Sequence, residues 1–178
     1  MTNIDALIIG IYGNEHLLGL YGAAQRPIGV LYVLPNFIGI SLLPILSRFL
    51  SDTEKKDIGV MMSLSAKASL TIALPIVLGG IVVAGPLMSV LFGNAYTSAV
   101  LTFQILLITL LFMFPGTLFA DVLLVENRQR FFVTTSIIGA CINVALDIIL
   151  IPRFGIAGSA VATVVAQIVL NTLYYFSV

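Results

Sequence analysis

Three ionic side chains lie inside segments that are otherwise apolar. Asp5 is in a short segment near Met1, Arg26 is about five residues inside a longer one, and Asp147 lies four residues after Asn143. Residues four apart share a helix face, so Asn143 and Asp147 point the same way. Charge inside a membrane is costly and is kept mainly along ion, proton or substrate pathways. Asp5, Asn143 and Asp147 are therefore candidates for a coupling-ion or proton site, with a structural interhelical hydrogen bond as the simpler interpretation.

Other kinds of chemistry are not indicated. The chain has one histidine, His16, expected in a solvated outside loop, and one histidine does not make a metal site. An intramembrane enzyme would need clustered His, Asp or Glu near one leaflet, whereas the carboxylates here are widely spaced. The single cysteine, Cys141, excludes an internal disulfide, and zero net charge gives no indication of nucleic acid. We predict no enzyme activity, no cofactor and no metal site.

The elements that carry these residues are membrane helices. The run from Ala68 to Ala120 contains no charged side chain, the chain is 60% hydrophobic and 9% charged, and its mean hydropathy is +1.14. A bilayer core of about 30 Å takes roughly 20 apolar residues as one helix, so this run must fold back on itself. Gly93 and Asn94 supply the turn, and Gly93 is predicted to end a helix in the αL conformation.

Apolar segments recur along the whole chain. They cover approximately residues 4–12, 21–47, 68–92, 98–120, 131–151 and 157–178. The first would make about 14 Å of helix, too short to cross, and looks like part of a helix in a longer chain. Gly155 and Gly158 suit a tight turn into the last segment, where Gly158, Ala162 and Ala166 form a stripe for close helix packing. We predict an all-α, polytopic transmembrane bundle, one domain over 1–178, with about five full spans plus a truncated first helix.

Basic residues set the orientation. Two of the predicted loops carry most of them and should face the cytoplasm. These residues are Arg48, Lys55, Lys56, Lys67, Arg128 and Arg130. Arg26 and Arg153 fall on the opposite side. The expected location is the cytoplasmic membrane, as a multi-pass protein.

Several stretches, taken in order, resemble a known family. They are Leu18–Arg26, Leu43–Arg48, Leu91–Ala99 and Asn143–Thr163. Together they are similar to the second half of polysaccharide flippases of the multidrug/oligosaccharidyl-lipid/polysaccharide exporter superfamily. The resemblance implies the C-terminal bundle of a two-bundle fold. It also implies alternating access that moves an isoprenoid diphosphate-linked oligosaccharide across the cytoplasmic membrane, for cell-surface polysaccharide biosynthesis.

The resemblance also implies roles for residues. Tyr21, Ala23 and Arg26 roughly match a Tyr-x-Ala-x-Arg pattern whose basic residue faces the substrate cavity, although Arg26 stands one position later. An arginine can hold phosphate oxygens with two parallel hydrogen bonds. Arg26, with Tyr21 and Gln25, is thus the predicted substrate-binding set. The alternative is an interfacial Arg26 that reaches outer-leaflet phosphates. Asp5 matches an acidic residue common in the preceding helix of the family.

The resemblance further implies partners and leaves alternatives open. The expected partners are membrane lipid, a lipid-linked sugar diphosphate, and a missing N-terminal bundle supplied by the same chain or by another. A multidrug/cation antiporter half of the same superfamily would instead need an acidic, cation-binding cavity, whereas Arg26 favours an anionic cargo. A non-transporting truncated membrane subunit is the remaining alternative.

Overall fold

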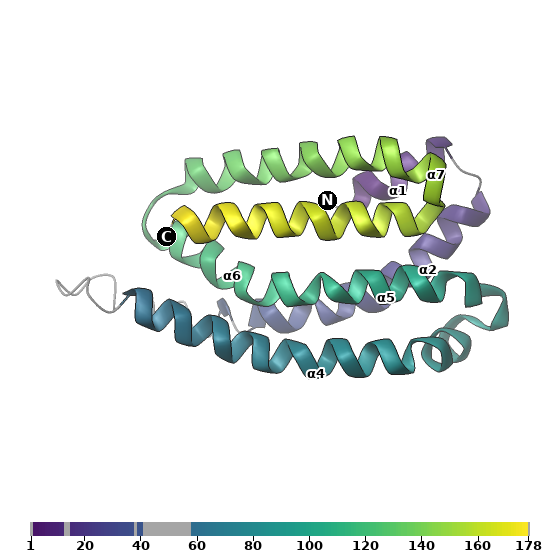
Figure 1. Cartoon of the computed structure of the whole chain (residues 1–178), viewed down its shortest axis with the longest axis horizontal. Helices are drawn as coiled ribbons and strands as arrows, with labels where there is room; N and C mark the ends of the chain where they lie inside the picture. Colours follow the sequence, from purple (N-terminus) through teal and green to yellow (C-terminus); the bar gives the residue numbers. More distant parts are fainter. Residues whose placement is uncertain (1, 13–14, 38, 41–57, 178) are drawn as a thin grey trace.

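The computed structural model describes residues 2–12, 15–37, 39–40 and 58–177, and every element in this part of the chain is helical. In chain order the elements are α1 (Thr2–Tyr12), α2 (Glu15–Leu31), α4 (Ile58–Phe92), the 3₁₀ helix η2 (Asn94–Ala99), α5 (Val100–Ile108), α6 (Leu110–Val125) and α7 (Gln129–Ser177). Figure 1 shows them as one elongated bundle. The predicted all-α membrane fold is confirmed.

Four helices among the described residues are long and apolar enough to cross a membrane. They are Glu15–Phe37, Ser63–Phe92, Asn94–Val125 and Gln129–Ser177. With 11 residues, α1 is shorter than a span, as predicted. The segments predicted at 21–47 and 68–92 begin earlier as helices, at Glu15 and Ile58, because a helix continues past the apolar part that marks the bilayer. The end of 21–47, with the stretch Leu43–Arg48, lies outside the described residues.

The long helix α7 is a hairpin of two limbs. Gly155 interrupts it with φ 58° and ψ −140°, a backbone conformation that is essentially confined to glycine. Figure 1 shows the second limb running back beside the first. The predicted fifth and sixth spans are therefore two limbs joined at Gly155. Gly93 also has a positive φ of 86°, but its ψ of 171° makes it more extended than the αL conformation predicted.

At Gly158 the two limbs of α7 lie close together. A Cβ at this position would lie 2.5 Å from the carbonyl oxygen of Leu150 on the first limb. Gly158→Ala is therefore expected to push the limbs apart and destabilise the bundle by about 1–3 kcal/mol, the usual effect of overpacking. Thermal unfolding in detergent, followed by circular dichroism, measures this. Gly79→Ala is the control, because nothing lies within 4 Å of its Cβ position; an equal loss there would contradict the account.

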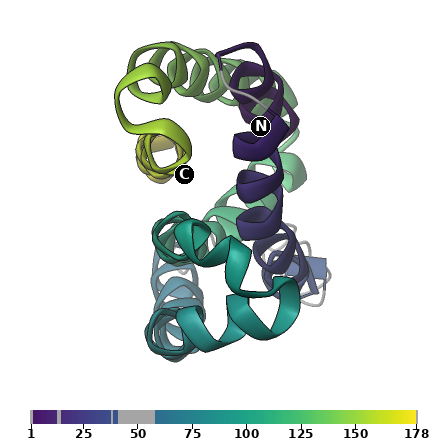
Figure 2. The ribbon, with the colours of Figure 1, turned by 90° about the vertical axis from the view of Figure 1, so that its right-hand side faces the viewer.

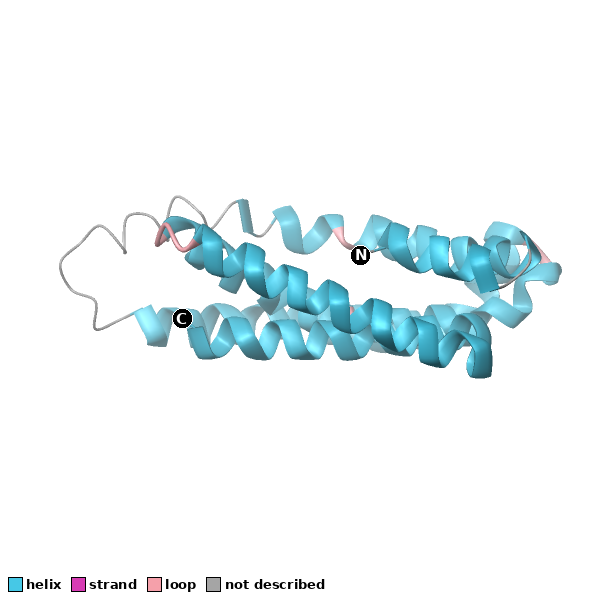
Figure 3. Ribbon diagram, turned by 90° about the horizontal axis from the view of Figure 1, so that it is seen from above, coloured by secondary structure: helices cyan, strands magenta, loops and turns pink. Residues whose placement is uncertain are grey.

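The helices are arranged so that α5 and α6 contact both α4 and α7. Figure 2, seen along the bundle, places the α7 hairpin and α1 in one part and α4 with α5 in the other, and Figure 3 shows the long helices running roughly along one axis. Helix α2 ends just before a turn at Tyr32, and a turn at Thr109 separates α5 from α6. The hydroxyl oxygens of Tyr32 and Thr109 are 2.6 Å apart, so the two turns are in contact. The core therefore runs lengthwise between the two parts.

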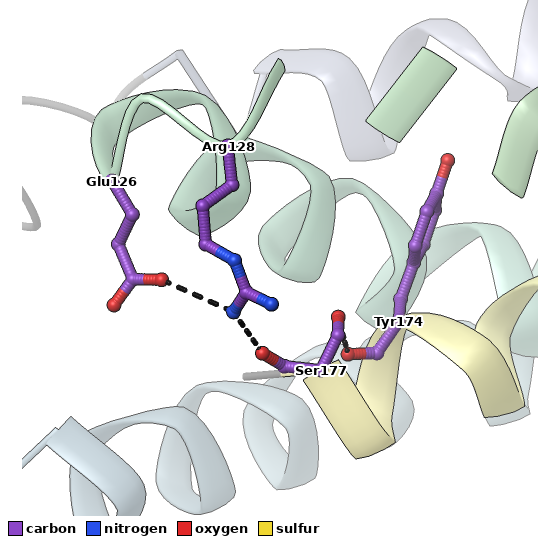
Figure 4. A network of polar contacts seen from close by, with 4 residues as sticks. All are labelled: Glu126, Arg128, Tyr174 and Ser177. Carbon is purple, nitrogen blue, oxygen red and sulfur yellow. Dashed lines mark hydrogen bonds and ion pairs between the residues drawn. The ribbon is translucent and has the colours of Figure 1, made fainter. Parts of the chain in front are cut away.

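A polar network closes the end of the bundle near the C-terminal end of α7 (Figure 4). The Arg128 guanidinium donates to the carbonyl oxygen of Ser177 and lies 3.6 Å from the Glu126 carboxylate. Tyr174 stacks on Phe132 with ring centroids 5.9 Å apart. A cation beside the last carbonyls of a helix complements its dipole. The network fixes the second limb of α7 against the turn between α6 and α7.

Candidate functional site

Six polar side chains are almost completely buried where α1, α2 and both limbs of α7 meet. They are Asp5 from α1, Tyr21 from α2, Asn143 and Asp147 from the first limb, and Ser159 and Thr163 from the second. We call this set the buried polar cluster. It unites the three predicted ion-site residues, Asp5, Asn143 and Asp147, although Asp5 lies far from the other two in sequence. Asn143 and Asp147, which were predicted to share one helix face, are both buried in this cluster.

One oxygen of the cluster, Asp5 Oδ2, receives two hydrogen bonds. The Tyr21 hydroxyl donates to Asp5 Oδ2 at 2.9 Å, and the Thr163 hydroxyl lies 3.1 Å from the same oxygen. Thr163 Oγ1 also lies 3.0 Å from the Ser159 carbonyl oxygen and 3.5 Å from the Asn143 amide nitrogen. Tyr21 and Thr163 thus position Asp5 between α2 and the second limb of α7.

The remaining oxygens of the buried polar cluster have no donor. Asp5 Oδ1, Asn143 Oδ1, both carboxylate oxygens of Asp147 and Ser159 Oγ are without a hydrogen-bond partner in the described part of the chain. Asp147 faces both the Asp5 carboxyl and the Ser159 hydroxyl. Buried acceptors without donors are costly, and two adjacent buried carboxylates cannot both be anionic without a cation. The arrangement therefore suits a proton or a small cation.

The donor set decides which cations fit. Carboxylate, amide and hydroxyl oxygens are ligands for hard cations, whereas transition metals prefer His and Cys. The described residues contain no group of three or more His, Cys, Asp or Glu side chains. No Lys or Arg side chain in the same part of the chain pairs with Asp5 or Asp147. The donor set of the cluster therefore matches a proton or an oxygen-ligated hard cation.

Arg26 lies away from the buried polar cluster. It is exposed on α2, whereas Tyr21 is fully buried and Gln25 is half-buried. Positions five apart on a helix differ by about 140° in direction, so Tyr21 and Arg26 face different surroundings. The structure therefore does not bring the predicted substrate-binding residues together, because Tyr21 holds Asp5 instead. Two cavities lie beside Arg26, one of about 500 Å³ and one of about 320 Å³.

Sequence reasoning missed two members of the cluster and misplaced one histidine. Ser159 and Thr163 are four residues apart on the second limb, beside the stripe of Gly158, Ala162 and Ala166, which is buried as expected. Their spacing mirrors that of Asn143 and Asp147 and is the signal that could have found them. The prediction of a loop at His16 was wrong: it is exposed, but it lies in the first turn of α2.

Comparison with known proteins shows that the chain is similar to probable flippases. It is 26% identical to the probable low-salt glycan biosynthesis flippase Agl15 of Haloferax volcanii over 96% of the chain and 36% of that relative. It is 25% identical to the probable flippase AglR of the same organism over 92% of the chain and 35% of that relative. The chain thus spans about a third of the length of each. No solved structure matches it.

The family assignment rests on a family model that matches most of the chain. Residues 23–178 match the family model described as lipid II flippase MurJ, which includes Arg26 and every member of the buried polar cluster except Asp5 and Tyr21. The resemblance to flippases of lipid-linked glycans is confirmed. This multi-pass membrane chain belongs to the lipid II flippase MurJ family.

Proposed function

We propose that this chain is the C-terminal bundle of a flippase that moves an isoprenoid diphosphate-linked saccharide across the cell membrane by alternating access. The observation that carries the proposal is the exposed guanidinium of Arg26 beside two cavities, one of them lined by apolar side chains, an arrangement that suits an anionic lipid. The family match and the glycan flippases among its relatives support the substrate class. An N-terminal bundle, in the same chain or a partner, supplies the other side of the substrate cavity.

The cluster gives the proposed transport cycle a driving element. A cation bound between Asp5 and Asp147 neutralises them and holds α1 and α2 against α7. When the cation leaves, the two carboxylates repel each other and these helices separate. A ligand shifts such an equilibrium only through its different affinity for the two states. Arg26, with Gln25, is proposed to contact the diphosphate, and Tyr21 to position Asp5.

A cation-coupled drug antiporter is the second candidate function. The observation in its favour is the same pair of buried acidic residues, which any cation-coupled transporter of this architecture would need. The exposed guanidinium of Arg26 beside two cavities favours an anionic cargo instead.

A flipping assay tests the proposal. We expect proteoliposomes that hold this bundle with its N-terminal bundle to move a fluorescent polyprenyl diphosphate N-acetylglucosamine between leaflets, as followed by a membrane-impermeant quencher. Unlabelled lipid-linked sugar should compete, and a cationic drug should not. Transport of the drug with no movement of the labelled lipid would contradict the flippase and support the antiporter.

A further inference from the structure

Two cavities of different chemistry meet at Arg26. The larger, of about 500 Å³, lies between α2, α4 and α5 and is lined, apart from Arg26 itself, by apolar side chains such as Val30, Leu87 and Leu107. We call it the apolar groove. The smaller, of about 320 Å³, lies along the first turns of α2 and is bounded by Phe92 and Tyr96. We call it the polar trough. Arg26 and Phe92 line both cavities, so the two lie next to each other.

The two cavities follow each other along α2. Glu15 is in the first turn of this helix, and Arg26 lies about three turns later, or roughly 16 Å along the axis. The apolar groove continues beyond Arg26 to Val30 and Leu31. From the start of α2 toward the middle of the span, the order is therefore the polar trough, the Arg26 guanidinium and the apolar groove. A ligand that fits this order has a polar head, an anion and a long apolar tail.

The polar trough is lined by groups that suit a sugar ring. Gly19 and Gly22 expose backbone to the trough, and no atom lies within 4 Å of the position that a Cβ would take at either residue. Glu15 can accept hydrogen bonds from sugar hydroxyls, and the Tyr96 ring offers a flat apolar face and a hydroxyl. In the described part of the chain neither the Glu15 carboxylate nor the Tyr96 hydroxyl has a partner.

We propose that the polar trough is a saccharide subsite of this flippase. The first sugar of the cargo lies between Glu15 and Tyr96, the diphosphate contacts Arg26, and the isoprenoid chain occupies the apolar groove. This assignment rests on the proposed function and adds to it the residues that bind the sugar. A phosphatidylethanolamine headgroup, with its ammonium group close to its phosphate, is the rival occupant of the same chemistry, and the binding experiment distinguishes the two.

Native mass spectrometry of this bundle assembled with its N-terminal bundle in detergent tests the subsite. The probes are a polyprenyl diphosphate, the same lipid carrying one N-acetylglucosamine, and phosphatidylethanolamine. We expect the sugar to raise affinity about tenfold, the usual effect of hydrogen bonds to a charged group. Glu15→Gln should remove that advantage without changing the affinity for the sugar-free lipid, and Tyr96→Leu should do the same.

The control is Glu126→Gln, the same chemical change at an exposed site outside both cavities, which should leave all affinities unchanged. Helix content by circular dichroism confirms that each variant is folded. Equal affinity for the two polyprenyl diphosphates, or displacement of both by phosphatidylethanolamine, would overturn the subsite alone. If neither polyprenyl diphosphate binds, the substrate class of the proposed function is overturned as well.

Discussion

Asp147→Asn is expected to abolish the stabilisation of the bundle by its coupling cation. The variant has one buried carboxylate instead of two, so no cation is needed to neutralise a pair. At a cation concentration 100 times the Kd, binding should stabilise the parent chain by about 2.7 kcal/mol, and the variant by close to zero. Without the cation, the variant should be the more stable protein. The measurement is thermal unfolding in detergent with sodium or potassium at constant ionic strength, and across a pH series.

The structural hydrogen-bond interpretation predicts a different pattern. If Asp147 only joins helices, the parent shows no cation response, and the variant loses about 0.6 kcal/mol, a typical value for such bonds in membrane proteins. Asp121→Asn is the matched control, because Asp121 is half-buried in α6 and outside the buried polar cluster. It should keep the full cation response. A parent protein that is indifferent to protons, sodium and potassium would exclude the cation site.

Arg26→Ala is expected to lower flipping of the lipid-linked sugar by about 100-fold. The substitution removes the charge-assisted contacts to the diphosphate, and hydrogen bonds to charged groups contribute up to about 3 kcal/mol. Arg26→Lys should restore only part of the rate, because an ammonium group does not reproduce the planar, two-pronged geometry of a guanidinium. The rate of quencher protection in proteoliposomes measures both variants.

Arg153→Ala controls for the loss of a positive charge in general. Arg153 is exposed on the first limb of α7, outside both cavities beside Arg26, and the charge distribution places it on the same side of the membrane. Its removal should leave flipping close to the parent rate. If Arg26→Ala and Arg153→Ala lower the rate equally, Arg26 acts through surface charge and does not bind the diphosphate.

Local sequence features predicted the helices and the turns between them well. A long run without charge and glycine at the turns are local signals, and they placed the turn at Gly93 and the hairpin at Gly155, but not the breaks at Tyr32 and Thr109. Sequence also selected Asp5, Asn143 and Asp147, because charge in an apolar segment is visible without any structure. These signals fixed the type of fold and part of the candidate site.

The remaining part of the candidate site depends on which helix faces lie against each other. Asp5 is hydrogen-bonded to Thr163, 158 residues away, and no periodicity encodes that contact. Tyr21 and Arg26 are close in sequence yet point in different directions, a separation that helical geometry could have predicted. The polar trough was not predicted, because it forms between Glu15 at the start of α2 and Tyr96 in η2, far apart in the chain.

A cation in the buried polar cluster is proposed to be coupled to movement of an anionic lipid. The most direct test of this coupling is the flipping rate of the labelled lipid-linked sugar in proteoliposomes under imposed sodium, potassium or proton gradients. We expect one of these gradients to accelerate flipping by the parent protein and to have no effect on Asp147→Asn. A parent rate that is unchanged by all three gradients would contradict the account.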